Sequence, residues 1–314
     1  MSRYDRLLID VHNIAHRVFK HKSETSSYVS KKKVYKQAIA NFIRTIEALE
    51  KQFLHSDGEI YLLFDNPTSR VDLQSSFYFS DRKLAYAKYK EDRSKEPKEF
   101  YNSIALIKYY YLVAEPKYRT IQINRLEADD LVDPCLKLYC DDCSVLLVSN
   151  DLDWVRYLNN YVHWLPKLNG EPETTDILAN RLGFPITETS LVTYKALFGD
   201  VADNIPAVIK SSYKSHFNEL LDQINTPDDV AMLSKDNSML ERFPLLHGVR
   251  ENERQYRINI QLIKAIPVAE KHLRYTTTTG RNSTPVKKAI QTAIGLESSS
   301  NTFVFGNIKR PRTC

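Results

Sequence analysis

Residues 145–154 read VLLVSNDLDW, a short apolar run that is followed directly by two aspartates, Asp151 and Asp153. Four consecutive apolar residues bounded by polar ones are typical of a strand that is buried on both faces of a parallel sheet. The carboxyl ends of parallel strands meet at one edge of the sheet, where ligands bind. We therefore expect both aspartates to lie at the functional edge of an α/β domain.

Similar strands alternate with amphipathic segments through the first two thirds of the chain. Further strands are predicted at 7–10, 60–65, 120–123 and 161–165. Helices are predicted between them at 34–53, 100–113 and 126–140. This alternation predicts a mainly parallel α/β sheet that is flanked by helices and joined by right-handed crossovers.

The strand signals stop at about residue 191, so the C-terminal third is predicted to be mostly helical. Helices are expected at 191–198, 212–224, 227–234, 251–263 and 285–294. The stretch 275–284, YTTTTGRNST, is expected to be a polar loop, and 298–314 a basic end that is poorly ordered or binds a partner.

Acidic side chains follow four of the predicted strands. A single acid in such a place is usually a helix cap or turn residue. Their joint placement at one edge, with a further acidic pair in GDVADN at 199–204, instead predicts a shared cleft. The acids are Asp10, Asp65, Glu127, Asp129, Asp130, Asp151, Asp153, Asp200 and Asp203.

Nine like charges in one cleft repel each other unless cations lie among them. Oxygen ligands without His or Cys select hard ions, which favours Mg²⁺ or Mn²⁺ over Zn²⁺. The acids are too many for one Mg²⁺ and suit two ions roughly 4 Å apart, which activate a water and stabilise a leaving oxygen in phosphodiester hydrolysis.

The segment 81–95, DRKLAYAKYKEDRSK, interleaves basic residues with Tyr86 and Tyr89. Basic side chains follow phosphates, and aromatic rings stack on unpaired bases. A solvated amphipathic helix is the alternative for this segment taken alone, but the acidic cleft favours contact with nucleic acid. The basic residues are Arg82, Lys83, Lys88, Lys90, Arg93 and Lys95.

The composition is that of an ordinary globular protein. The chain has 314 residues, of which 42% are hydrophobic and 26% charged, and this excludes disorder and coiled coil. We expect an intracellular protein without a membrane partner, because there is no long apolar run and no signal-peptide core. Cys135, Cys140 and Cys143 match an iron–sulfur spacing, but their apolar neighbours favour buried thiols of a helix.

At this point the sequence resembles the flap endonuclease/5′→3′ exonuclease family with its PIN-like nuclease fold, and within it the bacteriophage ribonuclease H and flap endonuclease branch. The similarity spans residues 7 to 206 in the order of the family. The matching blocks are LLIDVHN (7–13), YLLFDN (61–66), YKEDR (89–93), LEADDL (126–131), VSNDLDW (148–154) and LFGDVADNIP (197–206).

The resemblance implies a role for the acidic and basic residues of these blocks. A first metal region is implied at Asp10, Asp65, Glu127, Asp129 and Asp130, and a second at Asp151, Asp153, Asp200 and Asp203. Lys90 and Arg93 match the basic pair of the family's helical arch, beside Tyr89, which stacks on a base near the cut. The expected catalytic residues are Lys90, Arg93, Asp10 and Asp151.

The resemblance also implies a PIN-like nuclease domain over 1–198, with its arch at about 66–103, and a helical DNA-binding region with a C-terminal extension over 199–314. The family often has a glycine-rich turn after the last acidic block, whereas residues 204–212 contain no glycine. Lys210 and Lys214 are expected to contact phosphates there through their side chains. Pro134 also departs from the pattern, and it would kink the helix at 126–140 unless it lies in the first turn.

The expected function is that of a metal-dependent 5′→3′ exonuclease and flap endonuclease on DNA–DNA and RNA–DNA duplexes. Two Mg²⁺ ions are the expected cofactor, and Mn²⁺ is expected to substitute. The resemblance implies a monomer that removes RNA primers and flaps during phage DNA replication in the host cytoplasm. A single-strand-binding protein and other replication factors are the expected protein partners.

Two other functions stay open. A phosphatase of the haloacid-dehalogenase type also has acids at strand ends, but it needs Asp-x-Asp after the first strand, where this chain has Asp10 followed by Val11 and His12. A catalytically silent module that binds branched DNA would tolerate the loss of acids, yet all nine positions are filled.

Overall fold

The computed structural model describes residues 3–23, 31–66, 82, 86, 88–90 and 96–296. Within these ranges a six-stranded sheet has the strand order β5-β4-β1-β2-β3-β6, and all neighbours are parallel except β3 and β6. The strands are β1 (Tyr4–Asp10), β2 (Leu54–Leu63), β3 (Tyr118–Ile121), β4 (Val145–Val148), β5 (Val162–Leu165) and β6 (Thr277–Thr279). The predicted α/β class, with a mainly parallel sheet, is confirmed.

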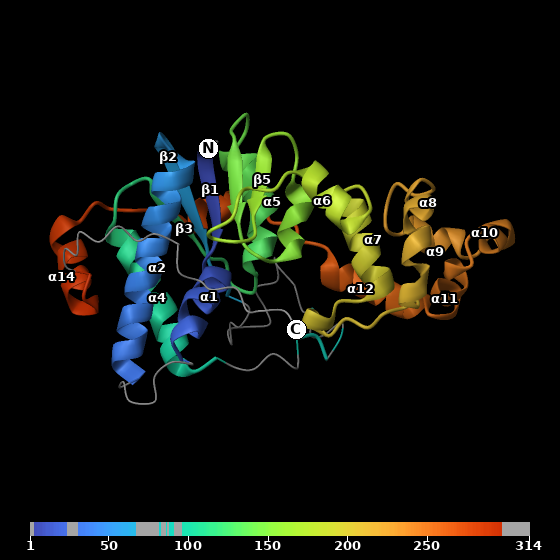
Figure 1. Cartoon of the computed structure of the whole chain (residues 1–314), viewed down its shortest axis with the longest axis horizontal. Helices are drawn as coiled ribbons and strands as arrows, with labels where there is room; N and C mark the ends of the chain where they lie inside the picture. The colour runs from blue at the N-terminus through green and yellow to red at the C-terminus, as the bar shows by residue number, and fades with distance from the viewer. Residues whose placement is uncertain are drawn as a thin grey trace.

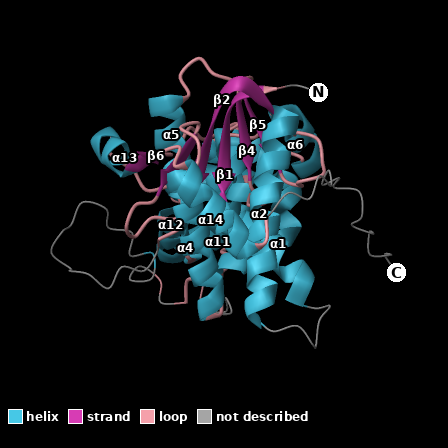
Figure 2. Cartoon of the chain, turned by 90° about the vertical axis from the view of Figure 1, so that its left-hand side faces the viewer, coloured by secondary structure: helices cyan, strands magenta, loops and turns pink. Residues whose placement is uncertain are grey.

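Helices cover both faces of this sheet (Figures 1 and 2). Successive strand residues point to opposite faces, so Leu7 and Ile9 of β1 pack on one side and Leu8 on the other. Burial on both sides explains why the strands are continuous apolar runs. The first side is covered by α1 (Val11–Ser23), α2 (Lys31–Phe53) and α4 (Lys98–Val113), and the second by α5 (Val132–Tyr139), α6 (Thr175–Leu182) and α7 (Glu188–Phe198).

The strands β1, β2 and β4 end at the same level. Asp10 pairs with Leu63, and the preceding Ile9 pairs with Val148. The residues that follow β2 and β4 therefore emerge beside Asp10, as the sequence predicted for a parallel sheet.

The remaining helices form the C-terminal part, with α8 to α11 at one end of the molecule and α14 at the other (Figure 1). After α12 the chain returns to the sheet edge, where α14 packs against α2 and α4. The boundary expected between a domain at 1–198 and a helical region at 199–314 stays a prediction. These helices are α8 (Phe217–Leu221), α9 (Asp229–Leu233), α10 (Asn237–Arg242), α11 (Leu245–Glu251), α12 (Glu253–Ile263), α13 (Glu270–Thr276) and α14 (Thr284–Ile294).

Two sequence-based expectations need correction, and the condition set for Pro134 is met. The stretch 275–284 is not only a loop, because it contains β6, whose partner β3 lies more than 150 residues earlier and gives no local signal. The helix expected at 126–140 is divided into a 3₁₀ turn, η1 (Ala128–Leu131), and α5. Pro134 is the third residue of α5, in the first turn, where its missing N–H is tolerated.

Much of the expected arch at 66–103 lies outside the described residues, as does the basic end at 298–314. Among the residues that the structure does describe, no helix is both long and apolar enough to cross a lipid bilayer.

Candidate active site

Three aspartates meet where β1, β2 and β4 end. Asp10 is only 7% exposed, and it accepts hydrogen bonds from the Asn13 backbone N–H at 2.9 Å and from the Ser149 hydroxyl at 3.0 Å. Burial raises the pKa of Asp10 well above its usual range, and the nearby carboxylates of Asp65 and Asp151 raise it further. The two hydrogen bonds oppose this shift only in part. This corner of the site therefore carries a surplus of negative charge.

The backbone holds the two partners of Asp10 in place. Asp65 accepts the Ala128 N–H at 2.7 Å, and its own N–H donates to His12 Nδ1 at 3.2 Å. Asp151 is the N-cap of η2 (Leu152–Tyr157) and accepts the Asp153 N–H at 2.9 Å. Burial, together with the charge of Asp153, raises the pKa of Asp151 to about 6.

The LEADDL block forms a second group around Arg82. The block begins η1 with a capping box, in which the Glu127 N–H donates to Asp130 Oδ2 at 3.1 Å. The guanidinium of Arg82 donates to Glu127 Oε2 at 2.7 Å and to Asp130 Oδ1 at 2.8 Å. Asp129 lies at 4.0 Å from the same guanidinium, and burial and the charge of Asp130 raise its pKa well above the usual range.

Lys90 connects this group to the last acidic block. Its ammonium group contacts Glu127 Oε1 at 2.6 Å and lies 3.7 Å from Asp203 Oδ2. Its backbone N–H donates to the Asp203 carbonyl at 3.0 Å, and Lys90 has a positive φ of 53°. Burial would lower the pKa of Lys90, but Glu127 and Asp203 hold it well above its usual range, so this lysine stays charged.

A third group surrounds Lys195, which the sequence analysis missed. Its ammonium group bridges Asp153 at 2.7 Å and Asp200 at 2.8 Å. Arg156 also contacts Asp153 at 2.7 Å. Burial would raise the pKa of Asp153, but these two cations hold it well below its usual range. The available signal was a lysine in the last turn of α7, five residues before Asp200.

Charge interactions link all nine predicted acids into one network. The cations within it are Arg17, which interacts with Asp10, together with Arg82, Lys90, Arg156 and Lys195. In the described part of the chain, no three His, Cys, Asp or Glu side chains are grouped as ligands of a metal ion. Basic side chains already contact many of the carboxylate oxygens. The donor set still fits hard cations, because it consists of oxygens and because Asp10 has carboxylates as charged neighbours.

The predicted nucleic-acid contacts divide into buried and exposed side chains. Arg82 and Tyr89 are 6% and 5% exposed, and the Tyr89 hydroxyl lies 3.3 Å from both Glu127 and Asp203. In this arrangement both side chains contact the neighbouring acids, and little of their surface is left for a phosphate or a base. Lys88 and Lys210 are exposed, as is Lys214, which lies over the rings of Tyr194 and Phe198. Lys83 and Arg93 lie outside the described residues.

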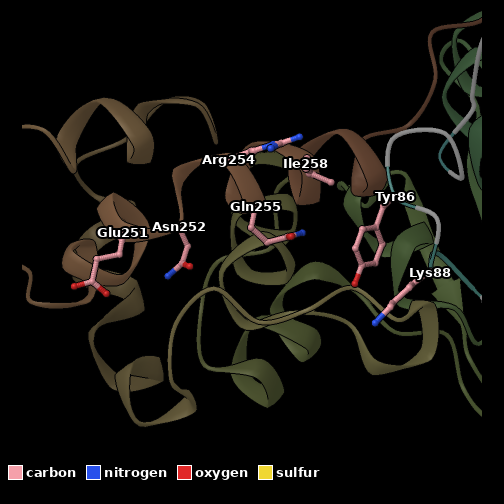
Figure 3. A pocket seen from close by; sticks show the side chains of 7 residues that line it. All are labelled: Tyr86, Lys88, Glu251, Asn252, Arg254, Gln255 and Ile258. Carbon is pink, nitrogen blue, oxygen red and sulfur yellow. The ribbon is translucent and has the colours of Figure 1, made fainter.

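An open pocket of about 580 Å³ lies between the segment that leads to Lys90 and the C-terminal helices (Figure 3). Tyr86 and Lys88 line it from one side, and residues of α11 and α12 line it from the other. The acids described above are not among its lining residues. The pocket therefore lies beside the acidic network and is not its cleft.

The chain matches a family model described as the 5′-3′ exonuclease, N-terminal resolvase-like domain, over residues 5–179. A 5′-3′ exonuclease of Buchnera aphidicola is 26% identical over 179 residues, which cover 57% of this chain and 57% of that protein. DNA polymerase I of Streptococcus pneumoniae is 31% identical over 142 residues, which cover 44% of this chain and 16% of the polymerase. The chain thus spans only part of the length of these curated relatives.

The fold is similar to a crystal structure of the bacteriophage T5 D15 flap endonuclease, a pseudo-enzyme-product complex with DNA and metal ions. The TM-score is 0.59 at 16% identity, over 94% of this chain and 98% of that chain. This likeness shows a shared fold. Because the family model covers more than half of the sequence and the nuclease fold agrees with it, the chain belongs to the 5′-3′ exonuclease family with its N-terminal resolvase-like domain.

Proposed function

We propose that the chain is a structure-specific 5′ nuclease, which hydrolyses phosphodiesters as a 5′→3′ exonuclease and flap endonuclease on DNA–DNA and RNA–DNA duplexes. The observation that carries this proposal is the meeting of Asp10, Asp65 and Asp151 at three parallel strand ends, in one charge network with Lys90. Family membership supports it, as does the similar T5 structure with DNA and metal ions.

Divalent ions suit the surplus of negative charge around Asp10. We propose that two Mg²⁺ ions bind among the nine acids, that Mn²⁺ can substitute, and that the strand-end acids are the first to be occupied. When bound, such ions activate a water and stabilise the leaving oxygen of a phosphodiester. Binding at Asp153 and Asp200 requires Lys195 to give up its contacts with their oxygens.

Lys90 supplies positive charge to the substrate in this proposal. Its ammonium group is charged and held by Glu127, so the scissile phosphate competes with that carboxylate for it. A fixed cation aimed at the reacting phosphate stabilises the charge that develops in the transition state. Phosphate contacts carry affinity without base readout, so the 5′ end and the duplex shape select the cleavage site.

The proposed role is the removal of RNA primers and flaps in DNA replication, by a monomer in the cytoplasm, which for a phage protein is that of the host. Similarity to DNA polymerase I supports a place in replication. A single-strand-binding protein or another replication factor is the proposed protein partner.

The test is a set of 5′-labelled substrates: a flap, a nick, an RNA–DNA hybrid and a blunt duplex, each incubated with Mg²⁺, with Mn²⁺ or with EDTA. We expect short 5′ products from the flap, the nick and the hybrid with either metal, and intact strands in EDTA. A chromogenic phosphate monoester serves as the control for a general phosphatase. Hydrolysis of the monoester alone, or DNA binding without cleavage in both metals, would overturn the proposal.

A further inference from the structure

Asn259 is a fully buried polar residue on α12, outside every predicted site. It is 0% exposed, and its side-chain amide donates two hydrogen bonds to backbone carbonyls, to Ala196 at 2.9 Å and to Pro206 at 2.8 Å. The first carbonyl lies in the last turn of α7, where helix carbonyls lack intrahelical partners. The second lies ten residues later. One side chain thus joins two points of the chain that enclose the last acidic block.

The segment between these carbonyls is a tight turn that carries Asp200 and Asp203. Asp200 and Ile205 exchange two backbone hydrogen bonds of 2.9 Å. Gly199 has a positive φ of 77°, and a Cβ there would lie 2.6 Å from the Ile205 carbonyl oxygen. The two ends of the turn therefore pass very close to each other, and Asn259 bonds to the backbone on both sides of the crossing.

The orientation of the amide is determined by its partners. Both backbone partners are carbonyl oxygens, so the nitrogen of Asn259 must face them. The oxygen faces Gln255, whose side-chain Nε2 donates to it at 2.9 Å. Gln255 lines the open pocket of Figure 3, one turn earlier on α12.

The last residue of α12 and the residues that follow it reach the other acids through backbone groups. The Ile263 carbonyl accepts a hydrogen bond from Arg156 at 2.8 Å, and the Lys264 carbonyl accepts one from Arg82 at 3.1 Å. The Ile266 N–H donates to Asp130 at 3.0 Å. The helix therefore contacts the acidic turn at its middle, and its last residue and the following segment contact the cations and acids of two other groups.

We propose that Asn259 is a positioning residue, which fixes the turn with Asp200 and Asp203 against α12 and thereby against the remaining acids. Its effect on cleavage rests on the proposed nuclease function, whereas its effect on the turn does not. Displacements of about 1 Å in a catalytic constellation are enough to lower rates by about 100-fold. Loss of the two hydrogen bonds from Asn259 to the backbone should therefore lower the rate of cleavage more than it lowers the affinity for DNA.

The test compares Asn259→Leu with a matched change on the same helix, Tyr256→Phe. Tyr256 is also 0% exposed, and its hydroxyl donates to the Pro227 carbonyl at 2.7 Å, away from the acidic turn. Hydrogen–deuterium exchange in EDTA reports on the turn, single-turnover cleavage on the rate, and flap-DNA binding in EDTA on affinity. Asn259→Ala, which introduces less bulk, replaces Asn259→Leu if the latter does not fold.

We expect Asn259→Leu to speed amide exchange at residues 200–205 by about 10-fold or more. The cleavage rate should fall by about 10- to 100-fold, and the Kd for DNA should stay within about 3-fold. Tyr256→Phe should change none of these beyond about 2-fold. Equal exchange in the two variants, or unchanged cleavage in Asn259→Leu, overturns the proposal. An inactive wild-type chain would refute the nuclease function. The exchange comparison would still show whether Asn259 fixes the turn that carries Asp200 and Asp203.

Discussion

Asp10 and Asp153 are two buried carboxylates of one network, yet their pKa values shift in opposite directions. The charged neighbours that act most strongly on Asp10 are Asp65 and Asp151, and its pKa is raised. Asp153 contacts Arg156 and Lys195, each at 2.7 Å, and its pKa is lowered. Burial favours protonation of both. The sign of the nearby charge therefore decides the direction in which each pKa shifts.

The difference divides the site into two halves with different charge balance. Around Asp153 the chain supplies its own cations, so the ionised acids are already compensated. Around Asp10 the repulsion from Asp65 and Asp151 outweighs the attraction of Arg17, and under the proposed function a divalent cation would relieve that repulsion. The predictions below alter one half at a time, beginning with the largest expected effect.

Replacing Asp10 with Asn should abolish cleavage, with a loss of at least about 100- to 1000-fold. The same change removes a buried charge that faces Asp65 and Asp151, so Tm at pH 7 should stay equal or rise. Cleavage of the 5′ flap and thermal unfolding measure the two effects. Asp57→Asn, at an exposed residue of β2, is the control and should leave both unchanged. Activity within a few-fold of wild type would show that Asp10 is not part of the machinery.

Replacing Lys195 with Met should lower the stability of the fold, in contrast to the Asp10 substitution. It leaves Asp153 and Asp200 without their shared cation, and breaking a buried ion pair costs about 3–5 kcal/mol of unfolding free energy. Urea unfolding measures the loss. Mg²⁺ should raise the Tm of this variant more than that of the wild type, because the ion can replace the missing charge.

The control for Lys195 is Lys235→Met. Lys235 is 60% exposed and contacts Glu253 at 3.1 Å, so its loss should cost less than about 1 kcal/mol. Equal destabilisation by the two substitutions would mean that Lys195 adds nothing beyond a surface ion pair.

The pH dependence of the unfolding free energy should also distinguish the two halves of the site, with a smaller effect. The folded-state pKa of Asp151 is about 6, above the value of about 3.9 in an unfolded chain. The folded state then binds more protons between these values, so the unfolding free energy should fall as pH rises from about 4 to about 6. Asp153 acts in the opposite direction, because its lowered folded-state pKa makes stability rise with pH near the unfolded value of about 3.9, and most of that rise is complete by about pH 5. Asp151→Asn should remove about 1–2 kcal/mol of this fall in EDTA, and parallel curves for the two proteins would contradict it.

The sheet and the acids were predictable because their signals are local. Each of the five parallel strands is a largely apolar run, whereas the polar strand β6 was missed. Each acid follows a strand or begins a helical turn, as with Asp10 and Asp151. Lys195 and Asn259 gave no such signal, because their roles depend on carboxylates and carbonyls that only the folded chain brings near. Arg82 was expected to contact nucleic acid because its basic segment was visible in the sequence. Its buried partners Glu127 and Asp130 were not visible there, because only the folded chain brings them near. Local patterns thus predict where charge collects, and tertiary contacts decide which charges remain for a ligand.

The smallest expected effect concerns the exposed cations. Lys210 precedes η4 (Ser211–His216) in the glycine-free turn and is exposed, unlike the buried Lys195. If Lys210 contacts a phosphate, Lys210→Ala should weaken duplex binding by a similar few-fold on every sequence and reduce the slope of log Kd against log salt by about 1. Lys137→Ala is the control, because Lys137 is 75% exposed and pairs with Asp133 on α5. A slope equal to that of the wild type would mean that Lys210 contacts only solvent. The turn would then have to bind the DNA duplex through other groups. A reduced slope would show that the lysines divide as the acids do. The buried Lys195 compensates carboxylates, and the exposed Lys210 contacts a phosphate.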